Sequence, residues 1–99
     1  MKVETTFERE FCSDLKELIV GCTIVKLNSR QGLPDRLIML GDKYALLEFK
    51  QHEKAKHQPN QDYYVDKINS QGGFARFIYP ENSGEILDEL LKWFFDELM

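Results

Sequence analysis

Two carboxylates and an ammonium group stand where strands would carry apolar side chains. Asp35 opens one apolar run, and Glu48 and Lys50 lie within the end of the next. Side chains two positions apart on a strand point to the same face of a sheet, so Glu48 and Lys50 share a face. A turn at residues 41–43 makes the two runs an antiparallel hairpin. The start of one strand then lies beside the end of the other, and the three side chains are predicted to converge.

This group of side chains has the composition of a metal-dependent hydrolytic site. Two close carboxylates repel each other, and a divalent cation with oxygen ligands removes that conflict. Such a cation polarises a phosphoryl oxygen and lowers the pKa of a bound water, while the ammonium of Lys50 neutralises charge that develops on the phosphate. The spacing alone also fits a solvated salt bridge between Glu48 and Lys50.

The elements that must hold these side chains follow from apolar periodicity and from turn residues. Apolar residues at helical spacing, β-branched runs and Gly or Pro boundaries predict the order αβββαβα. The predicted helices cover residues 7–20, 59–70 and 83–98, and the predicted strands cover residues 22–27, 35–40, 44–50 and 74–79. This order predicts the α/β class, with a mixed central sheet flanked by helices.

Size and composition allow one folded domain over residues 1–99. No apolar run approaches the roughly 20 residues of a membrane span and no signal peptide is visible, so we expect no membrane association and a cytoplasmic location. Cys12 and Cys22 have no metal-site or redox spacing and are expected to be free thiols. The net charge is −4, but residues 25–76 hold nine Lys or Arg against six Asp or Glu, which leaves this middle part positive enough to meet a polyanion.

The same residues carry a resemblance to a known family. Pro34-Asp35 followed by Glu48-Phe49-Lys50 resembles the signature of the PD-(D/E)XK nuclease superfamily. With Gly32 before Pro34 and Gln61 after the second strand, the pattern resembles the VRR-NUC branch, and more narrowly its short stand-alone phage forms, which are similar to Holliday-junction resolvases. The resemblance covers roughly residues 4–80 and implies a restriction-endonuclease-like αβββαβ core, here with an added C-terminal helix. It also implies a phage or bacterial host cell as the setting.

The resemblance implies a role for each matching residue. Asp35, Glu48 and the main-chain carbonyl of Phe49 would hold Mg²⁺ or Mn²⁺, Lys50 would be the catalytic lysine, and Gln61 would act from the following helix. Many members add a glutamate from the first helix. Glu4, Glu8 and Glu10 are the candidates, and we expect Glu8 because its spacing from the apolar residues places it on the sheet-facing side.

Basic side chains around this group are candidate contacts to phosphates of DNA. They are Arg30, Arg36, Lys54 and Lys56, and each could equally be a solvated charge. His52 and His57 lie in a polar loop and are expected to be exposed. Tyr63 and Tyr64 could stack on bases, although packing within the protein is the expected use of this pair.

The expected function is therefore hydrolysis of DNA phosphodiesters by a divalent-metal-dependent endonuclease, with branched DNA such as a four-way junction as the leading substrate. The alternatives are a DNA-binding module of the same fold without turnover, and a generic or flap-directed nuclease. The apolar arc of the last helix, which includes Trp93, Phe94 and Phe95, is wide enough to suggest a homodimer interface.

Overall fold

A computed structural model describes residues 5–29 and 31–95 of the chain. The predicted order αβββαβα is confirmed, with a short 3-10 turn before the last helix. The elements are α1 (Thr6–Leu18), β1 (Thr23–Lys26), β2 (Arg36–Leu40), β3 (Lys43–Phe49), α2 (Pro59–Ser70), β4 (Ala75–Ile78), η1 (Pro80–Asn82) and α3 (Ser83–Phe95). β1, β2 and β4 are shorter than predicted, and β3 begins and ends one residue earlier, so that Asp35 directly precedes β2 and Lys50 directly follows β3.

The four strands form one mixed sheet in the order β1-β2-β3-β4. β2 pairs antiparallel with β1 and with β3, whereas β3 and β4 are parallel. A parallel pair needs a crossover connection, and here the chain crosses through α2. Gly41 and Asp42 form the two-residue turn between β2 and β3, and Gly41 has the positive φ of +62° that such a tight turn requires.

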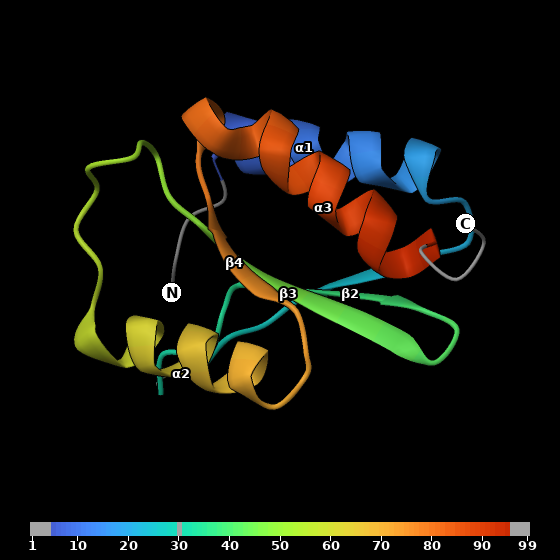
Figure 1. Cartoon of the computed structure of the whole chain (residues 1–99). Coiled ribbons are helices and arrows are strands. Elements are labelled where there is room, and N and C mark those ends of the chain that lie inside the picture. Colours follow the sequence, from blue (N-terminus) through green and yellow to red (C-terminus); the bar gives the residue numbers. More distant parts are fainter. Residues whose placement is uncertain (1–4, 30, 96–99) are drawn as a thin grey trace.

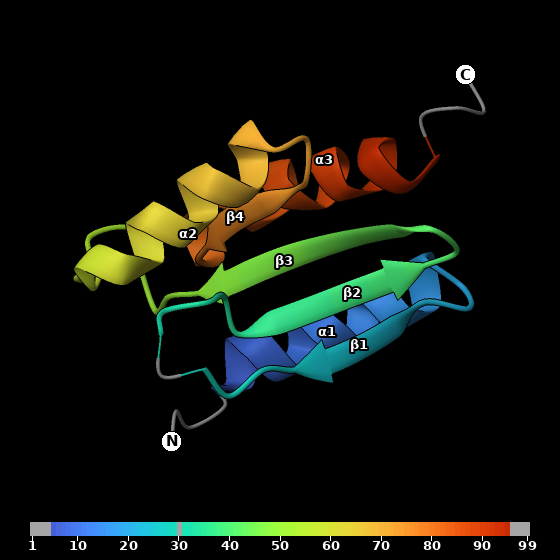
Figure 2. The same cartoon turned by 90° about the horizontal axis from the view of Figure 1, so that it is seen from below.

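The helices form a layer on each face of the sheet. α1 and α3 lie side by side on one face, and α2 lies on the other, towards β3 and β4 (Figures 1 and 2). α1 begins where the hydroxyl of Thr5 accepts a hydrogen bond from the main-chain N–H of Glu8 at 3.1 Å, which caps the first turn.

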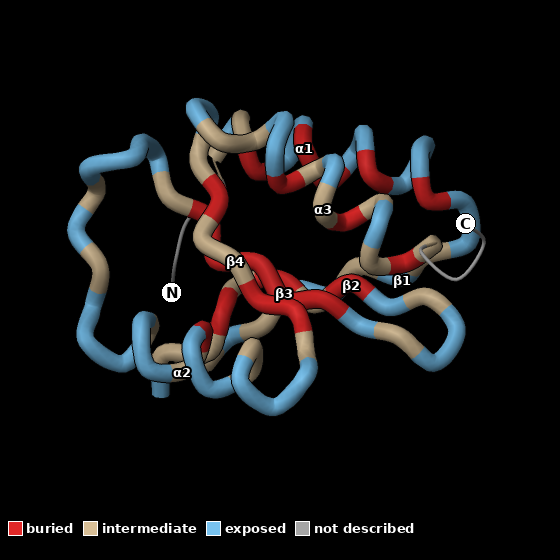
Figure 3. Tube along the Cα trace, viewed as in Figure 1, coloured by how far each residue is buried: buried red, intermediate tan, exposed pale blue. Residues whose placement is uncertain are grey.

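The larger core lies between the sheet and the pair α1 and α3, where Figure 3 shows buried positions on both helices and on the central strands. Phe11, Leu15, Ile38, Leu47 and Leu90 meet there. A smaller cluster of Leu46, Val65 and Ala75 packs between α2 and the opposite face. The sheet is therefore fixed from both sides at its β3–β4 half.

The last helix exposes less apolar surface than its sequence suggested. Phe94 is buried, and Trp93 and Phe95 pack against the same core within the chain. The Trp93 ring lies 5.6 Å from that of Phe74, and its Nε1 donates a hydrogen bond to the carbonyl of Tyr44. The expectation that these three residues form an exposed dimer patch is wrong, because one wide apolar arc covers both the sheet and its neighbouring helix. Leu98, at the end of the predicted helix, lies outside the described residues.

Neither Cys12 nor Cys22 forms a disulfide, in line with the prediction, and Cys12 is buried while Cys22 is half-buried. Burial raises the pKa of the Cys22 thiol, and the positive charge of Lys16 offsets part of that effect. Within residues 5–29 and 31–95, no helix has the length and apolar character needed to cross a membrane.

Candidate metal-dependent active site

The end of the β2–β3 hairpin brings Asp35, Glu48 and Lys50 together. Arg36 pairs with Leu47 across the two strands, so Asp35 comes level with Glu48. The carboxylate Oδ2 of Asp35 accepts a hydrogen bond from the main-chain N–H of Phe49 at 3.1 Å. This contact fixes one carboxylate directly beside the strand that carries the other.

Glu48 is an ionisable side chain in the interior, with 1% of its surface exposed. Its Oε2 accepts a hydrogen bond from Nε2 of Gln61 at 2.9 Å and lies 3.8 Å from Nζ of Lys50. A buried carboxylate is tolerated only where donors or cations compensate for lost hydration. The amide and the ammonium supply that compensation here.

Gln61 connects the carboxylate to the lysine. Its Oε1 accepts hydrogen bonds from Nζ of Lys50 at 2.7 Å and from the main-chain N–H of Gln58 at 3.1 Å. Two donors on the oxygen and one acceptor at the nitrogen define which way the amide points. Lys50 also donates to the carbonyl of Lys56 at 3.3 Å, so the loop before α2 closes around the ammonium.

A close backbone approach holds the loop before Asp35 against α2. Gly32 has a φ of +96°, and a Cβ at this position would lie 2.6 Å from Cβ of Asn60. Only glycine has both the conformation and the space for this contact. Gly32 therefore fixes the approach to Asp35 relative to the helix that carries Gln61.

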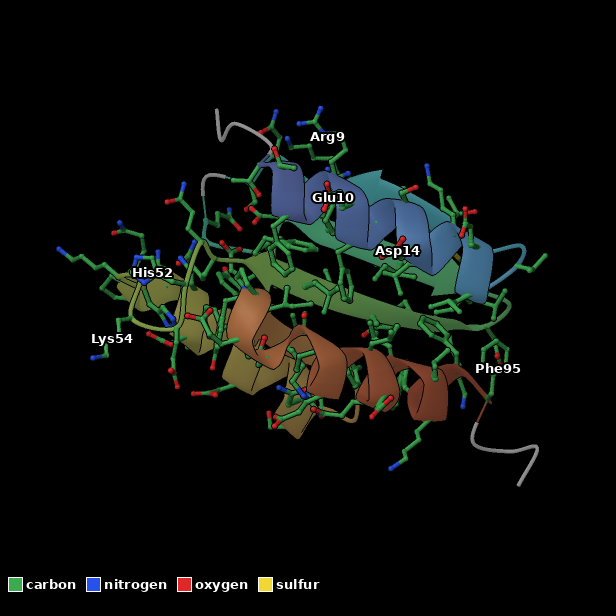
Figure 4. All side chains as sticks on the ribbon, turned by 90° about the horizontal axis from the view of Figure 1, so that it is seen from above. Arg9, Glu10, Asp14, His52, Lys54 and Phe95 are labelled. Atoms are coloured by element: carbon green, nitrogen blue, oxygen red, sulfur yellow. The ribbon has the colours of Figure 1, made fainter. Side chains whose placement is uncertain are left out.

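Glu8 and Arg36 form an ion pair on the other face of the sheet. Nε of Arg36 donates to Oε2 of Glu8 at 2.8 Å, and both residues are buried. Glu8 faces the sheet, as predicted, whereas Glu10 is exposed on α1 (Figure 4). The expectation that Arg36 contacts DNA needs correction, because successive strand residues alternate faces and its guanidinium is buried against Glu8. Glu4 lies outside the described residues.

The donor set at the hairpin end fits a hard divalent cation. Mg²⁺ is commonly bound by one or two carboxylates, with waters and substrate phosphate completing its shell. Asp35 and Glu48 provide the two carboxylates. Among the described residues no group of three or more His, Cys, Asp or Glu side chains could hold a metal ion, so Glu8 does not join the other two in this structure. The Phe49 carbonyl stays a predicted ligand.

Two of the remaining predicted DNA contacts lie on the loop between β3 and α2. Lys54 and Lys56 are exposed there, and Figure 4 shows Lys54 and His52 projecting from this loop at one end of the molecule. Arg30 lies outside the described residues. The Tyr63 and Tyr64 rings pack edge to face at 5.1 Å, with Tyr63 still 54% exposed.

His57 differs from its expected exposure. Its ring stacks on Phe77 at 3.9 Å, and its Nδ1 lies 3.0 Å from Oδ1 of Asp62. Neither this pairing nor a role for Phe77 was predicted from the sequence. The five-residue separation of His57 and Asp62 was visible, but the contact with β4 depends on the crossover through α2.

Comparison with solved structures identifies the fold of this chain. No protein-family model matches the chain, and no curated protein matches it. A solved structure described as "VRR_NUC domain" superposes with a TM-score of 0.64 at 23% identity, covering 85% of this chain and 97% of that one. A second, "VRR_NUC domain protein", superposes with a TM-score of 0.62 at 13% identity, covering 92% of this chain and 93% of that one. The chain therefore has the VRR-NUC fold.

Proposed function

We propose that this chain is a divalent-metal-dependent DNA endonuclease that hydrolyses phosphodiester bonds at the end of the β2–β3 hairpin. The observation that carries the proposal is the buried carboxylate of Glu48, bonded by Gln61, close to Lys50 and level with Asp35. A buried carboxylate with a second carboxylate beside it favours a cation between the two, because the cation relieves their repulsion.

Each residue has a distinct part in the proposed reaction. Asp35, Glu48 and the Phe49 carbonyl would hold Mg²⁺ or Mn²⁺, which when bound supplies Lewis acidity and a water of lowered pKa. Lys50 donates to a phosphate oxygen on which negative charge develops during hydrolysis. Gln61 orients the ammonium of Lys50 through the 2.7 Å contact, and the Lys56 carbonyl limits its movement.

Glu8 has a positioning role in this proposal rather than that of a metal ligand. Its carboxylate neutralises the guanidinium of Arg36, the residue that follows Asp35 in the chain. The pair joins α1 to the first residue of β2 and so fixes where that strand begins. Lys54 and Lys56, which are exposed on the loop beside the site, are the proposed phosphate contacts.

The proposed assembly is a homodimer, because a chain with one active site can cut both strands of a four-way junction together only by pairing. The interface we propose is the half of the sheet that α2 leaves uncovered. Val25, Met39 and Tyr44 lie on this face and are 37%, 36% and 45% exposed. Light scattering at micromolar concentration should give twice 11.7 kDa for the wild type and 11.7 kDa for Met39→Lys. A monomeric wild type would remove the dimer.

A DNA-binding module without turnover is the competing function. Purified protein should be incubated with a labelled four-way junction and with a linear duplex of the same sequence, with Mn²⁺ or with EDTA. We expect cleavage only with Mn²⁺, faster on the junction, and none by Glu48→Gln. Binding without cleavage in Mn²⁺ would establish the module, and equal rates on both substrates would reject the junction preference.

A further inference from the structure

Two adjoining hollows form a groove along the outer edge of β4. Figure 2 shows that this strand lies between α2 and α3. The first part of the groove has a volume of about 700 Å³ and is lined by His57, Phe77 and Tyr79 among others. Its second part has a volume of about 390 Å³, with Trp93 in its lining. Arg76 lines both parts, so they adjoin.

The first part begins next to the lysine of the proposed active site. Nζ of Lys50 lies 6.0 Å from the centroid of the Phe77 ring, which the His57 ring covers at 3.9 Å. Its charged lining residues are Glu53 and Arg76, which balance each other. A compartment with aromatic rings and no net charge suits a nucleobase better than a phosphate.

The second part is cationic. Lys43, Arg76 and Lys92 line it together with one carboxylate, Glu89, which lies 2.9 Å from Nε of Arg76. Nζ of Lys43 lies 5.5 Å from the Trp93 ring centroid. Positive charge beside an aromatic ring is the combination that binds the backbone and bases of single-stranded nucleic acid.

The β4 edge is closed to another strand. The Asn69 amide donates to the carbonyl of Ala75 at 2.8 Å and accepts from its N–H at 2.9 Å. The Asn82 amide likewise donates to the carbonyl of Phe77 at 3.1 Å and accepts from the N–H of Tyr79 at 2.9 Å. Side-chain amides occupy the positions where an added peptide strand would bond. The groove is therefore suited to a ligand bound through rings and charge.

We propose that this groove binds a single strand of DNA that leaves the active site along β4, with a base at Tyr79 and the backbone at Lys43 and Lys92. The proposal rests on the proposed nuclease function and adds that a single-stranded branch, which an intact four-way junction lacks, strengthens binding of the DNA beside the site. The strand would pass from the catalytic lysine, beyond the Phe77 ring and past Arg76, to the single tryptophan of the chain.

Fluorescence of Trp93, the chain's one tryptophan, reports occupancy of the second part directly. Oligo-dT is titrated into the wild type, Lys92→Gln, Tyr79→Leu and Lys16→Gln in EDTA, which prevents cleavage. Lys16→Gln is the matched control, since it removes the same charge from an exposed site on α1. We expect quenching in the wild type and Lys16→Gln, and roughly threefold to tenfold weaker binding in the other two variants. The slope of log K against log salt should fall by about 0.7 in Lys92→Gln only.

Failure of this inference differs from failure of the proposed function. If oligo-dT does not quench the wild type, or if Lys92→Gln and Tyr79→Leu bind as tightly as Lys16→Gln, the groove is not the binding site. If quenching and its variant dependence hold but no DNA is cut in Mn²⁺, the groove stands and the nuclease proposal falls. Circular dichroism checks that Tyr79→Leu is folded. If it is not folded, the oligo-dT affinity of Lys92→Gln alone tests the groove.

Discussion

Gln61 is joined to Glu48 by a hydrogen bond of 2.9 Å from its Nε2 to the buried carboxylate. The same side chain accepts from Lys50 through its oxygen, so one amide joins the buried carboxylate to the ammonium group of the site. Because Gln61 lies in the first turn of α2, the packing of that helix on the sheet determines the geometry of the site.

Replacing Gln61 by leucine should reduce cleavage by about 100-fold while the protein stays folded, since a preorganised donor at a reacting centre contributes on this scale. The change removes the bridge between Glu48 and Lys50 and leaves both side chains in place. Single-turnover cleavage measures it, with Gln71→Leu at the exposed end of α2 as the control. Equal rates for the two variants would show that the amide is not part of the site.

Breaking the Glu8–Arg36 pair should be costly because one charge stays buried. Glu8→Leu or Arg36→Met alone is expected to lower the free energy of unfolding by roughly 3–5 kcal/mol, and the two substitutions together should recover most of that loss. Urea denaturation of the single and double variants gives the coupling. If the two single effects simply add, the buried pair does not join α1 to β2 as we describe.

Asp35 has a structural contact as well as its proposed chemical role. Asp35→Ala removes the acceptor of the Phe49 N–H and should cost about 1–2 kcal/mol of stability, whereas Asp35→Asn keeps an acceptor oxygen and should cost less. Both should abolish metal-dependent cleavage, because neither keeps the charge. Thermal denaturation without metal separates the two variants. A more stable Asp35→Ala would mean that repulsion from Glu48 outweighs the hydrogen bond.

Substitution of Gly32 tests whether its contact with α2 positions the loop that precedes Asp35. Gly32→Ala places a methyl group 2.6 Å from Cβ of Asn60 in a backbone conformation that alanine rarely adopts. We expect a loss of at least about 1 kcal/mol of stability and a fall in cleavage, because Asp35 and Gln61 move apart. Gly84→Ala in α3, where a Cβ meets nothing, is the control. Unchanged cleavage in Gly32→Ala would show that this contact does not position the site.

The sequence predicted the elements that local patterns determine. The hairpin, the helix faces and the sheet-facing side of Glu8 all follow from periods of two and 3.6 residues. The partner of Glu8 did not follow, since Arg36 is 28 positions away and only the packing of α1 on β2 joins them. Strand alternation alone places Arg36 on the face opposite Asp35.

The width of the apolar arc on α3 did not predict how much of it is exposed. Trp93 was expected at a dimer surface, but its ring packs on Phe74 and its N–H bonds to Tyr44. Both partners come from distant segments, so burial at this helix depends on how β3 and β4 pass beneath it. For the same reason the stacking of His57 on Phe77 could not be predicted, because it requires the parallel crossover.

Nicking of supercoiled plasmid in Mn²⁺ tests directly whether this chain is a metal-dependent endonuclease, since it detects cleavage whatever DNA structure the enzyme prefers. Wild type, Glu48→Gln and Glu10→Gln should be compared at equal concentration, the last as a control carboxylate exposed on α1 (Figure 4). We expect nicking by the wild type and Glu10→Gln, none by Glu48→Gln, and none in EDTA. Nicking by Glu48→Gln at the wild-type rate, or no nicking by the wild type, would contradict the proposed function.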